Sequence, residues 1–487
     1  MSAGERIEVA GVRISPHHLI GGERVASRER FADSSPIDQQ LLAEVSRATA
    51  ADVDQAARAA ANAFPAWAAL GPAGRAPYLH RLAELIDANL EQLAAVECLD
   101  MGMLVRSLRA RVIARGARNY RAYAELALAY EERDWRSNGT WNRVQRMPAG
   151  PAAVITPWNA PFMLSTWKTA PALAAGCTVV LKPAEWSPLS CSLLADLTVE
   201  AGFPPGVFNL VQGIGEEAGT ALVSHPLVRR VSFTGSPETG RLIGKAAAAN
   251  LVPFTAELGG KNPFVVFADA DLDAAAAKAA GQYDDAGQVC LAGTRLLIQE
   301  SVLDAFLTRF HAEVDKHVLG DPRDDRTTIS PLIHPDHLAR VEGFVERARA
   351  AGDTIVRGGR RADIGRLWYE PTLVEPHAND AEIVQREVFG PVLTIQRFAG
   401  EAQAVELANS TEYGLSGIVF TGSAGRADRV GRAIRGGTIW VNAFLVRDLT
   451  APFGGMGISG IGREGGNYAL DFYSDLKTLQ ILDGSTV

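Results

Sequence analysis

The feature that most constrains this chain is an alternation of short apolar runs with turns or helical segments, which begins near residue 150. Such runs occupy residues 152–156, 178–182, 207–211, 228–234, 252–257 and 262–267. Between two of them we predict a helix over 188–201, with Ser187 as its cap and Pro188 in its first turn. Strands that alternate with helices in this way are typical of a parallel, doubly wound sheet.

A second alternating series follows in the C-terminal half. Its predicted strands are residues 294–299, 392–398, 415–421 and 438–441. We therefore expect an α/β fold with two α/β domains, the first for a cofactor and the second for catalysis. Ahead of both series, Thr49 and Asp52 form a capping-box pattern before an alanine-rich helix that extends through Phe64. A further helix is predicted from Gly74 towards Leu99.

Charge and composition exclude several classes of protein. The chain has 487 residues and a net charge of −8, so it offers no general attraction to nucleic acid or to an anionic membrane. The most apolar segment, 152–181, contains prolines and Lys168, which a membrane-spanning helix would have to bury. The N-terminal residues carry charges where a signal peptide needs an apolar stretch, and the four cysteines lack metal-ligand spacing. We expect a cytoplasmic location and no metal.

Two glycine-rich turns lie in the first α/β half. Residues 213–219, which include Gly215, follow one predicted strand, and residues 235–240, which include Ser236, follow the next. Glycine lets the backbone approach a pyrophosphate, and a helix N-terminus supplies amide donors. Neither turn is a strict G-x-G-x-x-G, and each taken alone is more typical of an ordinary strand-to-helix turn.

Lys182 and Glu185 close another predicted strand. A lysine and a carboxylate at the carboxyl end of a strand suit the two ribose hydroxyls of an adenosine. The carboxylate would also repel a 2′-phosphate, which favours NAD over NADP. From the spacing alone, a solvated turn explains these two residues equally well.

Cys290 is the most informative of the four cysteines. It lies in a glycine-bearing loop, 287–295, between a predicted helix and a predicted strand, where functional residues concentrate. A lone cysteine is more often a small buried hydrophobe, and Cys98, Cys177 and Cys191 fit that description. A nucleophilic thiol needs an activating group and an oxyanion donor nearby.

Two residues elsewhere suit those partner roles. Glu257 ends a predicted strand, and a carboxylate at the carboxyl edge of a parallel sheet points into the crevice where such folds bind ligands. Asn159 is an amide in a proline-bounded turn, and it suits a donor to an oxyanion. A turn-stabilising role for Asn159 is at least as compatible with the sequence.

These motifs occur together in one order, and over about residues 20–480 the chain resembles the aldehyde dehydrogenase superfamily. The matching segments are ITPWNAPF (155–162), LKPAEWSP (181–188), FTGSPETG (233–240), AELGGKNP (256–263), GQVCLAGTR (287–295), EVFGPV (387–392), WVN (440–442) and PFGG with SGIGREGG (452–466). Any one match alone is weak, but together and in order they are specific.

The resemblance implies roles for individual residues. Cys290 would be the nucleophile and Glu257 the general base, and Asn159 would form the oxyanion hole with the Cys290 amide. The cofactor would be NAD and the substrate a small-molecule aldehyde. The expected cofactor contacts are Thr156, Trp158, Lys182, Glu185, Gly215, Ser236, Glu387 and Phe389.

The resemblance also implies a domain organisation. An NAD-binding, Rossmann-like domain would comprise residues 1–125 and 145–258, and the catalytic domain residues 259–469. A small oligomerisation element would comprise residues 126–144 and 470–487. We expect a homodimer or a homotetramer.

The sequence departs from the family pattern at two places. The usual Phe-x-Asn ahead of Gly-Gln is Tyr283-Asp-Asp285, so we expect the wall near Cys290 to differ and to carry extra charge. The lysine that commonly follows PFGG-x is Gly457, which leaves the contacts of that final loop open.

The finer resemblance is to dehydrogenases of hydroxymuconic and carboxymethyl-hydroxymuconic semialdehydes. It depends on the residues around Arg447, the ending REGGNYALDFYSDLK, and residues 115–120. Arg115 and Arg447 would clamp a substrate carboxylate, because guanidinium binds carboxylate through two parallel hydrogen bonds. The alternative is that Arg115 belongs to a solvated helix face, since several arginines surround it, namely Arg106, Arg109, Arg111, Arg118 and Arg121.

Other functions remain open at this point. The aldehyde could be aliphatic or aromatic instead of a carboxylated semialdehyde. A CoA-acylating semialdehyde dehydrogenase typically lacks the glutamate found here at 257, and a catalytically inactive binding protein would have lost Cys290, Glu257 or Asn159. The sequence therefore favours a hydrolytic dehydrogenase over both.

Overall fold

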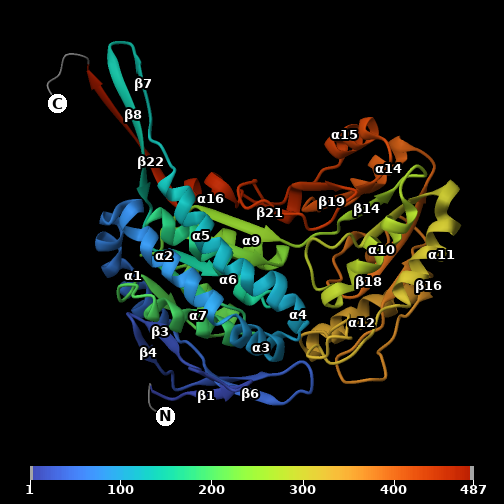
Figure 1. Ribbon diagram of the computed structural model, residues 1–487, viewed down its shortest axis with the longest axis horizontal. Helices are drawn as coiled ribbons and strands as arrows, with labels where there is room; N and C mark the ends of the chain where they lie inside the picture. The colour runs from blue at the N-terminus through green and yellow to red at the C-terminus, as the bar shows by residue number, and fades with distance from the viewer. Residues whose placement is uncertain (1–3, 483–487) are drawn as a thin grey trace.

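Two α/β lobes lie side by side in a computed structural model, which describes residues 4–482 (Figure 1). The first lobe holds an eight-stranded sheet with the strand order β21-β13-β12-β9-β10-β11-β3-β4. The five strands from β13 to β11 are parallel, as the alternating pattern predicted, and the others pair antiparallel at the edges. Their bounds are β3 His18–Ile20, β4 Glu23–Val25, β9 Ala152–Ile155, β10 Val179–Lys182, β11 Phe208–Leu210, β12 Arg230–Gly235, β13 Phe254–Leu258 and β21 Gly460–Ile461.

Both faces of this sheet are buried. Successive side chains of a strand point to opposite faces. In β9, Val154 joins one apolar cluster with Tyr120 and Phe162, whereas Ile155 joins a second cluster on the other face. The sequences of these strands are therefore continuous apolar runs, which is typical of a parallel sheet covered by helices on both sides.

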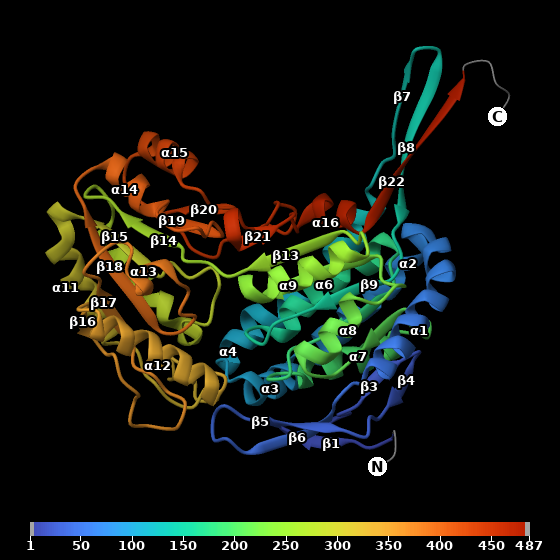
Figure 2. The same cartoon turned by 180° about the vertical axis from the view of Figure 1, so that it is seen from behind.

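The helices that cover the first sheet come from three parts of the chain (Figure 2). Their bounds are α1 Ala50–Ala69, α2 Gly71–Ala88, α3 Leu90–Met101, α4 Val105–Ser107, η1 Leu108–Ile113, α5 Ala114–Leu128, α6 Pro161–Ala175, α7 Leu189–Glu200, η2 Gly215–Gly219, α8 Thr220–Val223, α9 Pro237–Ala249 and α16 Gly466–Phe472. The predicted capping box is present at α1, where the Asp52 carboxylate accepts from the Thr49 amide at 2.8 Å.

Two details of the first lobe differ from the prediction. The single helix expected from Gly74 towards Leu99 is two helices, because Asn89 leaves helical geometry and its side chain donates to the Leu85 carbonyl. Pro188, and not Ser187, is the residue that precedes α7; the Ser187 hydroxyl instead donates to the Trp158 carbonyl.

The N-terminal residues form short strands that the sequence reading did not assign. Two antiparallel pairs precede α1, and their bounds are β1 Ile7–Val9, β2 Val12–Ile14, β5 Arg30–Ser34 and β6 Leu41–Ser46. Strands β1 and β2 have three residues each, too few to show a periodicity.

The second lobe holds a seven-stranded sheet with the order β16-β17-β18-β15-β14-β19-β20, parallel except for β16. Its strands are β14 Pro263–Val266, β15 Arg295–Gln299, β16 Thr354–Arg357, β17 Thr372–Glu375, β18 Val392–Phe398, β19 Ser416–Phe420 and β20 Thr438–Val441. Its helices are α10 Leu272–Ala280, η3 Gly281–Gly287, η4 Glu300–Val302, α11 Leu303–Val314, α12 Pro335–Ala350, α13 Glu382–Gln385, α14 Glu401–Ala408, α15 Ala424–Ala433 and η5 Gly457–Ser459.

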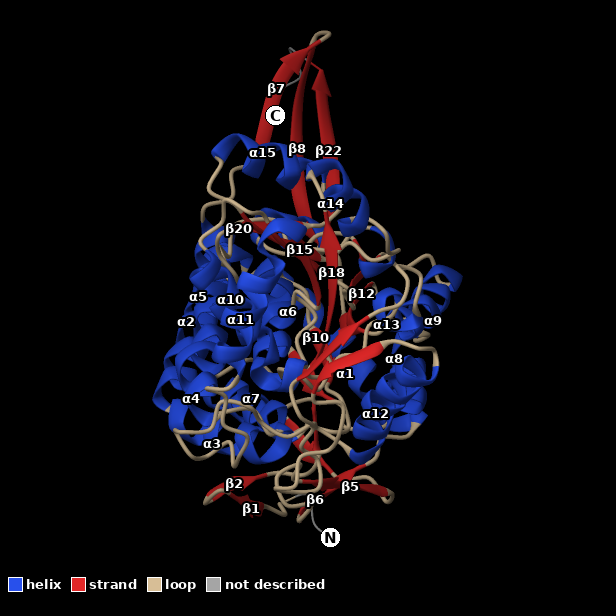
Figure 3. Cartoon of the chain, turned by 90° about the vertical axis from the view of Figure 1, so that its right-hand side faces the viewer, coloured by secondary structure: helices blue, strands red, loops and turns tan. Residues whose placement is uncertain are grey.

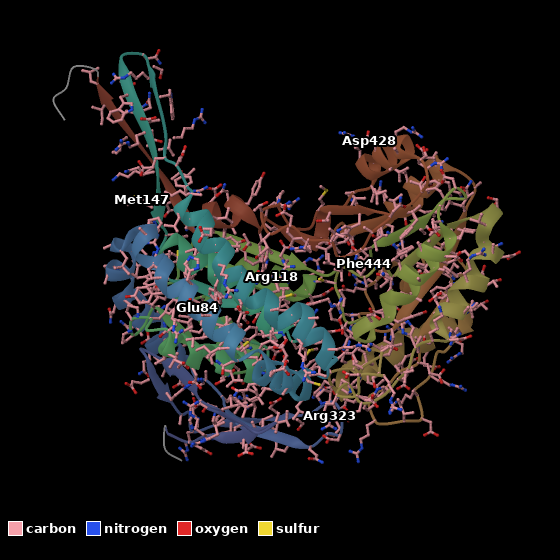
Figure 4. All side chains as sticks on the ribbon, in the orientation of Figure 1. Glu84, Arg118, Met147, Arg323, Asp428 and Phe444 are labelled. Carbon is pink, nitrogen blue, oxygen red and sulfur yellow. The ribbon has the colours of Figure 1, made fainter. Side chains whose placement is uncertain are left out.

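A three-stranded arm projects from the first lobe (Figure 3). It consists of β7 Arg133–Ser137, β8 Thr140–Pro148 and β22 Ser474–Leu482, with β8 in the middle. A two-residue turn at Asn138 and Gly139 joins β7 to β8, and both residues have positive φ, as such hairpin turns require. Figure 4 shows Met147 where the arm meets the lobe. Residues 483–487 of the predicted oligomerisation element lie outside the described residues.

Within residues 4–482, none of the helices is both long enough and apolar enough to span a membrane.

Candidate active site

The candidate site lies where the chain passes from the first sheet to the second. Glu257 is the penultimate residue of β13, and residues 259–262 lead directly into β14. The carboxyl ends of the first sheet's parallel strands, where such folds bind ligands, meet the amino ends of β14 and β15 of the second sheet at this junction. Figure 4 shows Phe444 at the same junction, on the second lobe, and Arg118 on the facing helix α5.

Cys290 lies in the loop between η3 and β15, and it is the one cysteine of the four that is partly exposed. The Asn262 side chain holds this loop by donating to the Cys290 carbonyl at 2.7 Å and to the Ala292 carbonyl at 2.9 Å. A side chain at Gly260 would place its Cβ 2.7 Å from the same Cys290 carbonyl. The glycine and the asparagine of the segment 259–262 therefore fix the position of the cysteine.

The electrostatic surroundings of Cys290 disfavour its thiolate. Burial raises the pKa of the Cys290 thiol to about 12, and the carboxylates of Glu387 and Glu257 raise it as well. Arg447 is the charge that lowers this pKa. A nucleophilic Cys290 therefore depends on Arg447, or on the transfer of its proton to a nearby base.

Asn159 reaches the cysteine loop from the first lobe. Its side-chain amide donates to the carbonyl of Gln288 at 2.9 Å, two residues before Cys290. A carboxamide has two N–H groups, so a second donor remains for another acceptor. The structure thus brings together two of the three predicted catalytic residues.

Glu257, the third, is buried at the same junction. Neither of its carboxylate oxygens has a hydrogen-bond partner among residues 4–482. Burial raises the pKa of Glu257 well above its ordinary value, and the negative charge of Glu464 raises it further. The positive charges of Lys168, Arg463 and Arg447 oppose this. A buried carboxyl with a raised pKa is the kind of group that serves as a general base near neutral pH.

Lys168 and Glu464 form a buried ion pair that the sequence reading missed. Lys168 also donates to the Ser232 hydroxyl at 3.0 Å, and the Trp167 indole donates to Glu464 at 2.6 Å. The sequence contained one signal, since Lys168 is a charge inside an otherwise apolar segment.

The predicted adenosine contacts also come together. The Lys182 ammonium lies 3.3 Å from the Glu185 carboxylate and donates to the Pro183 carbonyl at 2.8 Å. The glycine-rich turn faces them: a Cβ at Gly215 would lie 4.0 Å from Glu185, and a Cβ at Gly219 would lie 3.9 Å from the Lys182 side chain. A cation, a carboxylate and an open glycine backbone fit a ribose next to a pyrophosphate.

Ser236 and Thr156 lie on the same side of the first sheet. Ser236 is the cap of α9, and its hydroxyl accepts from the Thr239 amide at 3.1 Å, so the helix N-terminus is directed to this region. The Thr156 hydroxyl bonds to Ser165 in the interior at 3.0 Å, and Thr156 is fully enclosed. Its side chain is therefore engaged inside the lobe.

Glu387, Phe389 and Trp158 form the opposite wall of this region. Glu387 accepts from the Gly260 amide at 2.9 Å, and burial raises its pKa to about 7. The Phe389 ring meets the Trp158 ring edge-on with centroids 5.3 Å apart, although the two residues come from different lobes.

Arg115 and Arg447 share one aromatic neighbour. The Arg115 guanidinium lies 5.2 Å from the centre of the Trp167 ring, and Arg447 lies 5.6 Å from it and 3.8 Å from that of Phe453. Burial lowers the pKa of Arg115 to about 10, and the charge of Arg447 lowers it further. The Arg115 Nε has no hydrogen-bond partner among residues 4–482, and two neighbouring guanidinium groups are suited to an anion.

The other arginines near Arg115 behave differently, because they bind elsewhere or face solvent. Arg109 pairs with Glu91 and Arg121 with Asp87 on the surface, and Arg118 is exposed. Arg115 is therefore not simply one member of a solvated helix face.

The two departures from the family pattern have structural explanations. Tyr283 is buried in the second lobe and donates to the Thr372 carbonyl at 2.9 Å, so it does not line the wall near Cys290. Asp285 carries the extra charge instead; its carboxylate lies 4.0 Å from Arg111, and burial raises its pKa to about 6. Gly457 has a φ of +59°, and a Cβ there would meet the Glu412 carbonyl at 2.4 Å, so a lysine does not fit.

The chain is similar in sequence to known semialdehyde dehydrogenases. The 2-hydroxymuconic semialdehyde dehydrogenase of Pseudomonas sp. (strain CF600) is 40% identical over 478 residues, covering 95% of this chain and 98% of that protein. The 5-carboxymethyl-2-hydroxymuconate semialdehyde dehydrogenase of Escherichia coli is 38% identical over 462 residues, covering 93% of this chain and 98% of that protein.

Solved structures share the fold over nearly the whole chain. The crystal structure of an indole-3-acetaldehyde dehydrogenase complexed with NAD+ has a TM-score of 0.94 at 37% identity and covers 97% of each chain. The sequence also matches the aldehyde dehydrogenase family over residues 24–479. The expected fold and family are thereby confirmed, and the chain belongs to the aldehyde dehydrogenase family.

Proposed function

We propose that this protein oxidises an aldehyde to a carboxylic acid with NAD, with Cys290 as nucleophile and Glu257 as general base. The observation that carries the proposal is the hydrogen bond from Asn159 to the Gln288 carbonyl. It joins an oxyanion donor on the first lobe to the cysteine loop on the second, beside the carboxyl end of β13 that bears Glu257.

The first step is addition of the Cys290 thiolate to the aldehyde carbon, which leaves a negative charge on the former carbonyl oxygen. The remaining N–H of Asn159 and the backbone N–H of Cys290 stabilise that oxygen. Each such donor is worth about 3–4 kcal/mol in the transition state. When bound, NAD accepts the hydride that leaves this carbon.

The second step is hydrolysis of the thioester on Cys290. Glu257 removes a proton from water, which attacks the acyl carbon and releases the acid and the thiol. Burial raises the pKa of Glu257, so its carboxylate is a stronger base than that of an exposed glutamate. The Lys168–Glu464 pair tunes that pKa through its two opposing charges.

The proposed cofactor is NAD rather than NADP. Glu185 lies beside Lys182 and the glycine turn, where its carboxylate would accept from a free 2′-hydroxyl and repel a 2′-phosphate. The solved relative with NAD+ supports the choice of a nicotinamide cofactor.

The proposed substrate is a semialdehyde that also carries a carboxylate, as the names of the two semialdehyde dehydrogenase relatives suggest. Arg447 lowers the pKa of both Cys290 and Glu257, so its charge acts at the reaction centre, and Arg115 lies on the same ring, that of Trp167. An aliphatic or aromatic aldehyde is the alternative. Glu257 argues against a CoA-acylating enzyme, in which water is not the acyl acceptor.

We further propose that the arm formed by β7, β8 and β22 joins copies of the chain into a homodimer or homotetramer in the cytoplasm. Its outer strands have an unpaired edge, and Leu476 on β22 and Trp135 on β7 are exposed. An exposed strand edge with apolar side chains is a template for pairing with another chain. Light scattering of the intact protein tests this, and a monomer at micromolar concentration contradicts it.

The experiment that tests the function is an assay of NADH formation with a panel of aldehydes. Carboxylated semialdehydes are compared with neutral aldehydes of similar size, each with NAD and with NADP. We expect NADH formation with a preference for NAD and for the carboxylated compounds. Absence of NADH formation with every aldehyde contradicts the proposal, and equal rates for both classes contradict the substrate assignment.

A further inference from the structure

The two lobes also meet along the segment formed by α4 and η1 of the first lobe. Within it, the Arg106 guanidinium donates to the Asp325 carbonyl of the second lobe at 2.5 Å. Further along, the Arg111 guanidinium lies 4.0 Å from the carboxylate of Asp285, which also belongs to the second lobe. Asp285 precedes Cys290 by five residues. The contact between Arg111 and Asp285 therefore joins the first lobe to the chain that leads into the cysteine loop.

Asp285, Ala286 and Gly287 form a left-handed turn. Their φ angles are +52°, +54° and +68°. Glycine adopts this conformation freely and aspartate does so occasionally, whereas alanine rarely adopts it. The turn is also tightly packed, because a Cβ at Gly287 would lie 2.2 Å from the Gly390 carbonyl. Contacts from the surrounding structure are needed to keep three residues in such a conformation.

Gln288 connects this turn to the proposed oxyanion donor. The Gln288 backbone amide donates to the Asp285 carbonyl at 3.1 Å, and its side-chain amide donates to the same carbonyl at 3.3 Å. The Gln288 carbonyl in turn accepts from the Asn159 side chain at 2.9 Å. A shift of Asp285 would therefore move the carbonyl that Asn159 binds, and with it the loop that carries Cys290.

The carboxylate of Asp285 lies in a poorly solvated place. Its side chain is 12% exposed, and its Oδ1 has no hydrogen-bond partner among residues 4–482. Burial raises the pKa of Asp285 to about 6; the positive charges of Arg111 and Arg106 lower it, and the adjacent Asp284 raises it. A buried carboxylate is costly unless an opposite charge compensates it. The compensating arginines come from the first lobe, so the charge of Asp285 favours contact between the lobes.

We infer that Arg111 and Asp285 are positioning residues whose ion pair holds the turn 285–287, and hence the cysteine loop, in place against the first lobe. This inference rests on the proposed function, in which Cys290 attacks the aldehyde beside Asn159. Both positioning residues act through the backbone that leads to the nucleophile, and not by contact with the aldehyde.

Arg111→Met and Arg109→Met form a matched pair for the test. Both arginines lie in η1 and both side chains are about half exposed, but Arg109 pairs with Glu91 within the first lobe. The rate of NADH formation in a single turnover, with enzyme in excess over aldehyde, should fall about fivefold in Arg111→Met, as expected for a partly exposed ion pair. Arg109→Met should keep the wild-type rate. Arg111→Lys retains the charge and should recover most of the rate.

Asp285→Asn separates the charge of this residue from its backbone conformation. Asparagine has nearly the same shape as aspartate and also tolerates the left-handed region, so a loss in this variant reports the charge. Its single-turnover rate should fall by the same factor as that of Arg111→Met. The double variant should be no slower than either single variant, because both remove one interaction. Calorimetric titration should show an unchanged affinity for NAD in all of them.

Alkylation of Cys290 by iodoacetamide, without NAD, gives a readout that does not depend on turnover. Besides burial, three charged groups have the largest effects on the pKa of this thiol, namely Glu387, Glu257 and Arg447. A changed alkylation rate in Arg111→Met or Asp285→Asn would therefore report the position of the loop. We expect a change in both variants and none in Arg109→Met.

The outcomes separate the inference from the function on which it rests. A wild-type protein that forms no NADH with any aldehyde refutes the proposed function. If the wild type is active, and Arg111→Met and Asp285→Asn match it in single-turnover rate and in alkylation, the positioning role is refuted, even if their thermal midpoints are lower. Losses that add in the double variant refute the pairing. Should Asp285→Asn fail to fold, equal rates in Arg111→Met and Arg109→Met overturn the inference alone.

Discussion

The two ends of the proposed cofactor site are built in different ways. At the adenosine end, Lys182, Glu185 and the turn 213–219 come from adjacent strand–turn–helix units of one sheet. At the reaction end, Asn159 and Cys290 come from different lobes, and side-chain bonds to backbone carbonyls join them. The adenosine end depends on the first lobe alone, whereas the reaction end exists only while both lobes are in contact.

The two ends also differ in how their charged groups are surrounded. Glu185 is partly exposed and paired with Lys182. Glu257 is buried with no hydrogen bond among the described residues, and burial raises its pKa; burial also raises the pKa of Cys290 to about 12. Unsatisfied buried groups with shifted pKa values gather where chemistry is done. Substitutions should therefore change rates by orders of magnitude at the reaction end and change selectivity by small factors at the adenosine end.

The largest effect is expected for Cys290→Ala. Without the thiol there is no covalent addition to the aldehyde, so NADH formation should be abolished, while NAD binding measured by calorimetry should remain. Cys98→Ala, a substitution of a buried cysteine in the first lobe, is the control and should stay active. Substantial NADH formation by Cys290→Ala would contradict the role of Cys290 as nucleophile.

Glu257→Gln should separate the two chemical steps. Because the carboxylate acts on water, the variant should give a burst of NADH close to one per site and then turn over about 10²- to 10³-fold more slowly than the wild type. Stopped-flow absorbance records both phases. Loss of the burst, in a variant that folds and binds NAD and aldehyde, contradicts the assignment of Glu257 to hydrolysis.

Arg447→Ala and Arg115→Ala test whether the reaction end also selects the substrate. A charge-assisted hydrogen bond to a carboxylate contributes about 1.5–3 kcal/mol, so kcat/KM for a carboxylated semialdehyde should fall about 10- to 100-fold. Neutral aldehydes of similar size should be affected much less. Arg118→Ala, on the exposed face of α5, is the matched control. Equal losses for both substrate classes would make the arginines structural.

Glu464→Gln should move the pH dependence of turnover. Glu464 raises the pKa of Glu257, and Lys168 lowers it. Removing the Glu464 charge leaves the lysine uncompensated, so Glu257 ionises at lower pH, and the acidic limb of the kcat profile should shift to lower pH. An unchanged profile, in a variant whose thermal midpoint shows that it folds, means that Glu464 does not act on Glu257.

The smallest effect is expected at the adenosine end. Glu185→Gln removes a partly exposed charge worth about 1 kcal/mol, so the preference for NAD over NADP in kcat/KM should fall about fivefold. Steady-state kinetics with both cofactors measures it. If the preference is as strong in the variant as in the wild type, Glu185 is turned away from the ribose.

The sequence predicted what depends on local periodicity. Both parallel sheets and the α1 cap follow from apolar runs and from side chains a few residues apart. The break at Asn89 was missed because residues on both sides of it favour a helix, and its cause is a side-chain bond back to Leu85. The family resemblance supplied the roles of Cys290 and Glu257, which spacing alone left open.

The other contacts of the site join residues that are far apart in the sequence. Glu464 reaches the neighbourhood of Glu257 and Lys168 only because β21 returns to the edge of β13 after the whole second lobe. Asn159 and Asn262 bind backbone carbonyls, and a carbonyl is present at every residue, so no sequence pattern marks its partner. Periodicity and spacing therefore do not predict such contacts.

The arm has a consequence for how the chain is made. Strand β8 lies between β7 and β22, and residues 140–148 pair with residues 474–482 at the far end of the chain. During synthesis the β7–β8 hairpin emerges early, and one edge of β8 stays open until residues 474–482 have been made. An open edge can recruit other nascent chains. Completion of the arm is therefore a late folding event, and a chain that ends before β22 should accumulate as aggregate even if both lobes form.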